Sequence, residues 1–105
     1  MKKITTREMA GKILKLLYHL EFDEEIDGIS SEILEKKSRL GKIKIRNALR
    51  YLERKGLITG KRMIGGNWID IKLTGEGITT VEDEDKYKRY FEVNVGFFKW
   101  GVTER

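Results

Sequence analysis

The sequence predicts an α+β domain in which three helices precede a β-hairpin. Apolar residues recur with a helical period over residues 42–55, and two extended runs, residues 57–64 and 68–73, flank Gly65-Gly66-Asn67. A short stretch with a serine cap comes before that helix. Because glycine accepts the positive φ of a tight turn, this order predicts a helix-turn-helix followed by a hairpin wing. A further short helix and a C-terminal aromatic β-strand complete the predicted fold.

Length and composition indicate a single core. The chain has 105 residues, no cysteine and no proline, and 37% of its residues are charged. Without cysteine there is no disulfide framework, thiolate metal site or cysteine nucleophile. No apolar run approaches the roughly 20 residues of a membrane span, and the N-terminus lacks the apolar core of a signal peptide. We therefore expect a cytoplasmic protein without a metal, and the bias to Lys, Glu and Ile indicates a thermophilic source.

A first helix is predicted from Thr5 to about Glu21. Thr5 and Glu8 have capping-box spacing, in which both side chains satisfy backbone donors at a helix start. The core face of this helix is predicted from an apolar stripe at helical spacing, Met9, Ile13, Leu16, Leu17 and Leu20. His19 is the only histidine, and we predict that it lies at the surface without a chemical role. Residues 21–28 are acidic but lack the ligand spacing of a calcium loop, which favours a solvated connector.

The central helix is predicted over residues 42–55, after a short helix that begins at Ser30 or Ser31 and ends near Lys37. One face of the central helix is apolar at the 3.6-residue period and must be buried; it comprises Ile45, Ala48, Leu49 and Leu52. The opposite face is basic and amide-bearing; it comprises Ile43, Asn47, Arg50 and Arg54, with Arg46 on its flank. Gly56 follows the last turn, where a left-handed residue ends many helices.

The second strand of the predicted hairpin alternates in polarity. Its core-facing set is predicted to be Ile69, Ile71 and Leu73, and its outward set Trp68, Asp70 and Lys72. Lys61 and Arg62 lie on the approach to the turn. A helix-turn-helix followed directly by such a hairpin predicts a winged helix, whose wing rests on phosphate or enters the minor groove.

The positive charge of the chain is concentrated in one segment. Residues 36–62 contain eleven basic residues and one acid, a local charge of +10. Since the whole chain carries +5, the other 78 residues carry −5. This segregation indicates a localised polyanion footprint; the alternative is that a solvated helix is simply rich in lysine.

The C-terminal part is predicted to add a helix and a strand. Thr74 can cap a helix that holds Ile78 and Val81. Residues 87–100 carry six of the ten aromatic residues, and apolar residues alternate there, which predicts a strand. We divide the chain into a winged helix-turn-helix domain of residues 1–83 and an extension of residues 84–105.

The aromatic surface of the extension must be covered, because so much apolar area is costly in water. It can pack on the domain, form a homodimer, or stack on single-stranded bases beside the lysines of this region. The residues predicted for an oligomer contact are Tyr87, Tyr90, Phe91, Phe97, Phe98 and Trp100.

Two stretches resemble a known family. Residues 46–58, Arg-Asn-Ala-Leu-Arg-Tyr-Leu-Glu-Arg-Lys-Gly-Leu-Ile, are similar to the end of the recognition helix in winged helix-turn-helix regulators of the MarR-like kind and their archaeal relatives. Leu-Thr-Gly-Glu-Gly at residues 73–77 is similar to the family's Leu-Thr-x-x-Gly segment. The resemblance covers roughly residues 5–83. Two departures are that Gly41 stands where Ser or Thr often caps the recognition helix, and that the C-terminal part does not resemble the long MarR dimerisation helix.

The resemblance and the basic face together imply binding of double-stranded DNA, with transcriptional regulation as the role. The residues assigned to this interface are Arg39, Lys42, Ile43, Lys44, Arg46, Asn47, Arg50, Lys61 and Arg62. Asn47 can pair with adenine and either Arg46 or Arg50 with guanine, each worth ~1–3 kcal/mol of discrimination. Ile43 can meet a thymine methyl or pack against the wing. Useful affinity would ordinarily require a homodimer.

The leading alternative is a winged helix that serves as a protein–protein module in a larger assembly, for which the aromatic C-terminus is the sequence cue. An enzyme is not expected, because there is one histidine, no cysteine and no glycine-rich phosphate loop. We predict no cofactor, and no small-molecule ligand is identifiable from the sequence.

Overall fold

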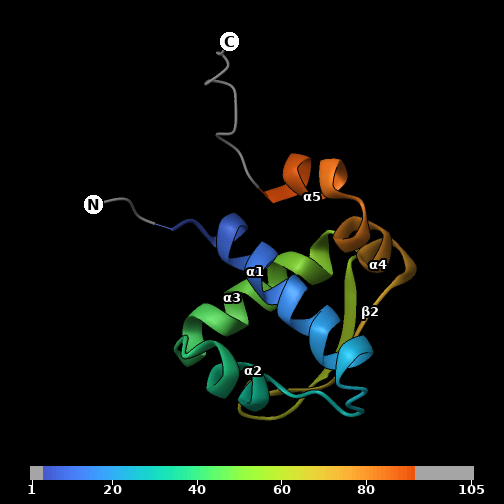
Figure 1. Cartoon of the computed structure of the whole chain (residues 1–105). Helices are drawn as coiled ribbons and strands as arrows, with labels where there is room; N and C mark the ends of the chain where they lie inside the picture. Colours follow the sequence, from blue (N-terminus) through green and yellow to red (C-terminus); the bar gives the residue numbers. More distant parts are fainter. Residues whose placement is uncertain (1–3, 92–105) are drawn as a thin grey trace.

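The computed structural model of the protein describes residues 4–91. The elements in chain order are α1 (Thr6–Tyr18), the π-helical turn η1 (His19–Asp23), α2 (Ser31–Ser38), α3 (Lys42–Arg54), β1 (Ile58–Arg62), β2 (Trp68–Leu73), α4 (Gly75–Glu82) and α5 (Glu84–Phe91). Figure 1 shows α1 and α3 crossing at the centre, with α5 beside the N-terminal end of α1 and α2 at the opposite end of the molecule. The predicted α+β winged-helix order is therefore confirmed.

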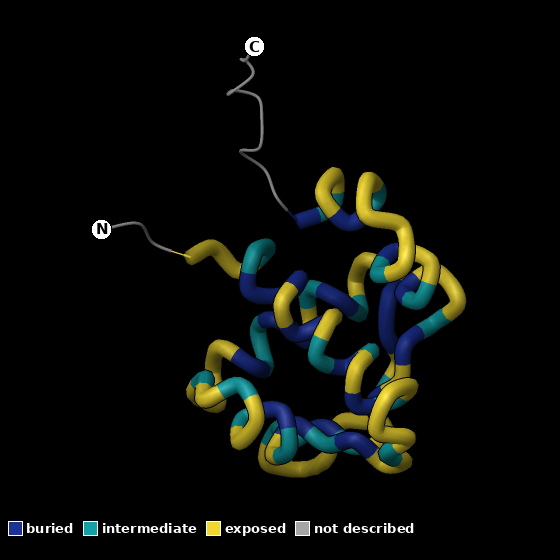
Figure 2. The backbone as a smooth tube through the Cα atoms, viewed as in Figure 1, coloured by how far each residue is buried: buried dark blue, intermediate teal, exposed yellow. Residues whose placement is uncertain are grey.

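The core lies between α1, α3 and the hairpin. The predicted apolar faces of both helices are buried, with Leu17, Ile45 and Leu49 completely inaccessible to solvent. Figure 2 shows the buried residues gathered where these helices cross and the exposed residues on the outer turns. This packing fixes α3 from behind and leaves its basic face outward.

Side-chain caps begin three of the helices, as the sequence predicts. Thr5 and Glu8 form a complete capping box at α1. The Ser30 hydroxyl accepts a bond from the Ile33 amide, and the Thr74 hydroxyl accepts one from the Gly77 amide at 3.0 Å. The N-cap of α3 is Gly41, which offers no side-chain bond. Gly56 has φ +74°, the left-handed conformation predicted after α3.

The predicted alternation of β2 is wrong at Trp68. Trp68 is only 2% exposed and lies on the core side with Ile71 and Leu73. The pairing shifts from Thr59 opposite Lys72 to Lys61 opposite Ile69, so β2 holds one extra residue. Asp70, with φ +51°, lies within this bulge, which reverses the side-chain alternation before it.

The predicted C-terminal strand is wrong over its first residues, because Tyr87 to Phe91 belong to α5. Tyr87, Tyr90 and Phe91 stand at i, i+3 and i+4, a helical spacing that also suits packing against another helix. Tyr87 and Phe91 are buried in the same core cluster as α1. An added Cβ at Gly11 of α1 would lie 2.8 Å from the Phe91 ring, so α5 packs closely over this glycine. The rest of the predicted strand, with Phe97, Phe98 and Trp100, lies outside the described residues.

Within residues 4–91, no helix has the length and apolar character needed to cross a membrane. The same part of the chain contains no group of three or more acidic or histidine side chains arranged to hold a metal ion.

His19 lies at the surface and is held by two carboxylates. Its Nδ1 lies 2.9 Å from the Asp23 Oδ2, and its Nε2 lies 2.9 Å from the Glu24 Oε2. The hydrogen bond to Asp23, followed by that to Glu24, raises the pKa of His19 above its ordinary value. The stretch that sequence analysis treated as a solvated connector therefore contains a small pH-dependent cluster.

His19→Asn should reduce stability under acidic conditions and have little effect under alkaline ones. Because the folded pKa is raised, the contribution of His19 is complete below its unfolded pKa of about 6.5 and disappears as pH rises through the folded pKa. Thermal unfolding of both proteins at about pH 5 and about pH 9 measures this difference. An equal loss of Tm at the two pH values would contradict the ionic role.

Candidate nucleic-acid interface

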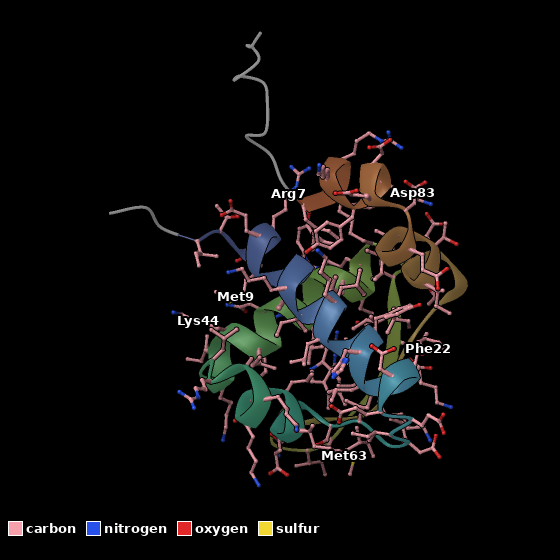
Figure 3. All side chains as sticks on the ribbon, viewed as in Figure 1. Arg7, Met9, Phe22, Lys44, Met63 and Asp83 are labelled. Atoms are coloured by element: carbon pink, nitrogen blue, oxygen red, sulfur yellow. The ribbon has the colours of Figure 1, made fainter. Side chains whose placement is uncertain are left out.

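The N-terminal half of α3 presents a basic face to solvent. Lys42, Lys44 and Arg50 are exposed, and none of the three forms an ion pair with an acid in the described part of the chain. Figure 3 shows Lys44 projecting outward from the edge of the molecule. Ile43 is 72% exposed, so it does not pack against the wing. Burial of the opposite face of α3 in the core positions these side chains outward.

Arg46 links α3 to the turn of the hairpin. Its Nη2 donates to the carbonyl oxygen of Gly65 at 2.9 Å and to the Asn67 Oδ1 at 3.2 Å. An added Cβ at Gly66 would lie 2.7 Å from the Arg46 Cζ, so the guanidinium lies directly against the turn. Arg46 is half-buried there, and its guanidinium holds the turn rather than extending into solvent.

Asn47 and Arg50 form a pair on the outward face of α3. The Arg50 Nη2 donates to the Asn47 Oδ1 at 2.5 Å. Two of the predicted base-reading groups therefore lie together, one turn apart on one helix face.

The cations of the hairpin are engaged with neighbouring acids. The Lys61 Nζ lies 3.8 Å from the Asp70 Oδ2, and the Arg62 Nη2 lies 2.5 Å from the Glu53 Oε1 on α3. The Arg62 guanidinium also lies 4.7 Å from the centre of the Trp68 ring. These exposed contacts are weak and exchange readily, so both cations can still reach a phosphate.

The turn of the hairpin, residues 63–67, is hereafter called the wing tip. Met63 is 50% exposed, and Ile64 is fully exposed at 104%. Gly65 and Gly66 have φ +97° and +93°, the positive values that the sequence predicts for this turn. Sequence analysis assigned no role to the two apolar residues, although their position beside a glycine pair was the available signal.

Arg39 lies at the junction between α2 and α3. It has φ +63° and ends α2, with its amide donating to the Glu35 carbonyl at 2.9 Å. Its side chain is exposed, on the same side of the chain order as the first turn of α3. A left-handed residue here turns the chain between the two helices.

A second basic cluster lies beside α5 and was missed by sequence analysis. A cavity of about 370 Å³ is lined by Arg7, Tyr51, Lys55, Lys86, Arg89 and Tyr90. Arg7 donates to the backbone carbonyls of Arg89 and Tyr90, and Lys86 pairs with Glu76. Residues separated by nearly the whole described chain form this cluster, so no local pattern predicts it. Figure 3 places Arg7 at the opposite end of the molecule from Met63 of the wing tip.

Two short helices joined by a tight turn, the second basic outside and apolar inside, followed by a two-stranded wing, define a MarR-like winged helix. No protein-family model matches the sequence, and no curated protein matches it. Solved structures do match, and they are similar to this chain in fold.

A mutant of MepR from a multidrug-resistant S. aureus clinical isolate matches with a TM-score of 0.59 and 25% identity over 90% of this chain and 63% of that one. MarR matches with a TM-score of 0.54 and 20% identity over 89% of this chain and 60% of that one. The chain thus spans less than two thirds of each structure. The likeness to MarR is a likeness of fold alone. These neighbours are transcription regulators and not enzymes, as the sequence predicts for this chain.

Proposed function

We propose that this protein binds double-stranded DNA through α3 and the wing and acts as a transcriptional regulator. The observation that carries the proposal is the set of exposed cations Lys42, Lys44 and Arg50 on a helix whose other face is fixed in the core. A rigid helix with such a face fits the major groove. The MarR-like fold of the chain supports the same role.

Affinity and sequence preference come from different residues in this proposal. Lys42, Lys44 and Arg39 contact phosphate and release counterions, a contribution without sequence information. Asn47 and Arg50 read adenine and guanine edges, for which their 2.5 Å mutual bond must open or the pair must act as a unit. Ile43, exposed at the first turn of α3, contacts a thymine methyl.

Arg46 is better suited to positioning the wing than to reading a base. Its guanidinium already donates to the wing tip at two acceptors. Extending it into a groove would break both bonds and release the turn that they hold. We therefore propose that Arg46 sets the distance between the wing and α3, while Lys61 and Arg62 contact the DNA backbone.

Arg46→Ala should loosen the wing tip while leaving the helical core folded. With the two bonds removed, the Gly66 amide, which donates to the Met63 carbonyl at 3.0 Å, should exchange with solvent about tenfold faster. Hydrogen exchange by NMR measures this rate, and the Leu49 amide in the core of α3 is the internal control. Unchanged exchange at the wing tip would remove the positioning role from Arg46.

A homodimer is proposed because one winged helix contacts only a few base pairs. Tyr87 and Phe91 are buried within the protomer and are poorly placed for this contact. Tyr90 is half-buried, and it remains a candidate together with Phe97, Phe98 and Trp100, which lie outside the described residues. Sedimentation of the full chain with and without DNA tests the assembly.

Titration of a labelled mixed-sequence duplex with the full chain tests the proposed function. At ~50 mM salt the duplex should bind, and affinity should fall steeply as salt rises, because phosphate contacts release counterions. Undetectable binding at low salt would overturn the DNA proposal and leave the protein–protein module as the remaining hypothesis.

A further inference from the structure

The wing tip carries apolar side chains where a DNA-contacting hairpin is expected to be polar. Ile64 is the most exposed large apolar residue in the described part of the chain, and Met63 beside it is half exposed. Full exposure of a branched apolar side chain costs free energy, and the fold gains nothing from Ile64 in return. A binding partner that covers it would recover this energy.

The wing tip is held in one conformation. The Met63 amide donates to the Asn67 carbonyl at 2.7 Å, and the Gly66 amide donates to the Met63 carbonyl at 3.0 Å. Arg46 adds its two bonds to Gly65 and Asn67 from α3. Ile64 is therefore presented on a turn that is anchored to the proposed recognition helix, so little conformational entropy is lost when it binds.

The charge around the wing tip selects the kind of partner. Residues 36–62, which include α3 and β1, carry a net charge of +10, whereas the rest of the chain is acidic. An apolar tip on a basic hairpin matches a surface that is anionic at its edges and apolar within. The minor groove of DNA has this character, with phosphates along both rims and stacked bases at its floor.

We propose that Ile64, supported by Met63, is an apolar wedge that enters the minor groove and partly unstacks one base step. This inference rests on the proposed function, since α3 must occupy the adjacent major groove for the wing to reach the minor groove. Side chains that act in this way kink the duplex toward the major groove. The protein consequently prefers a flexible pyrimidine–purine step beneath the wing, without any hydrogen bond to the bases there.

Duplexes that carry 2-aminopurine at successive positions, and donor and acceptor dyes at their ends, test the wedge. With the wild-type full chain, fluorescence should rise at one step only, and the distance between the duplex ends should shorten on binding. Ile64→Ala should abolish both signals and weaken binding by about tenfold, because burial of the isoleucine outweighs the opening of one step. Thermal unfolding should not change, because Ile64 contacts solvent rather than the core.

Ile64→Lys separates the wedge from simple attraction to phosphate. The added cation should preserve most of the affinity while the unstacking and bending signals disappear. If Ile64→Ala and Ile64→Lys bend and unstack the duplex as the wild type does, the wedge is wrong and the DNA-binding proposal stands. If the wild type binds duplex with neither signal, the wedge is also wrong. If the wild type does not bind duplex, the proposed function fails and the wedge fails with it.

Discussion

Gly77→Ala is expected to destabilise the fold by about 3 kcal/mol. Gly77 is buried in the first turn of α4, and an added Cβ would overlap the Leu57 carbonyl oxygen and lie 3.1 Å from its carbonyl carbon. That oxygen accepts a bond from the Thr74 amide at 3.0 Å, which ties the start of the hairpin to the start of α4. Because backbone stands on both sides of the contact, neither can move without breaking this link.

Urea unfolding of wild type and Gly77→Ala measures the loss. Gly75→Ala is the matched control, because it lies in the same turn and an added Cβ meets nothing within 4 Å. Alanine is favoured over glycine in a helix by ~1 kcal/mol, so the control should be neutral or slightly more stable. A Gly77→Ala variant as stable as the control would show that α4 does not pack against Leu57.

The largest expected loss of DNA affinity follows from replacing Lys42, Lys44 and Arg50 together by alanine. If each contacts one phosphate, the three substitutions should weaken duplex binding by roughly 100-fold near 0.1 M salt. All three side chains are exposed and outside the core cluster, so the helical content and Tm should stay close to those of the wild type. Fluorescence anisotropy with a labelled duplex measures the affinity.

A triple variant of Lys55, Lys88 and Arg89 to alanine is the matched control, because it removes the same total charge. Lys55 follows α3, and the other two residues lie on α5, at the end of the molecule away from the wing tip. The control should lose affinity only weakly, through the general field of the protein. A loss equal to that of the first triple variant would place the DNA on the cluster beside α5 instead.

Local rules predicted most of the fold. The capping box at Thr5, the caps at Ser30 and Thr74 and the left-handed Gly56 are all set by nearby residues, and each is present in the structure. The apolar face of α3 was also predictable, because Ile45 to Leu52 repeat at a helical period that only one orientation can bury.

Features that depend on distant residues were not predictable from periodicity. The bulge at Asp70 reversed the outward placement of Trp68, and it is set by pairing across the hairpin. Tyr87 to Phe91 can be read with either period, and packing of α5 over Gly11 decides for the helix. Arg46 has the same residue type as Arg50, but its contact with the wing tip depends on how close the hairpin lies to α3.

The proposed binding surface is tested most directly by the salt dependence of duplex affinity for the wild type and the Lys42, Lys44 and Arg50 triple variant. In a plot of log affinity against log salt, the slope of the variant should be shallower by about 2.7, which corresponds to three lost phosphate contacts on duplex DNA. Parallel lines for the two proteins would mean that these side chains do not contact phosphate, and would contradict the assignment of α3 as the DNA-binding helix.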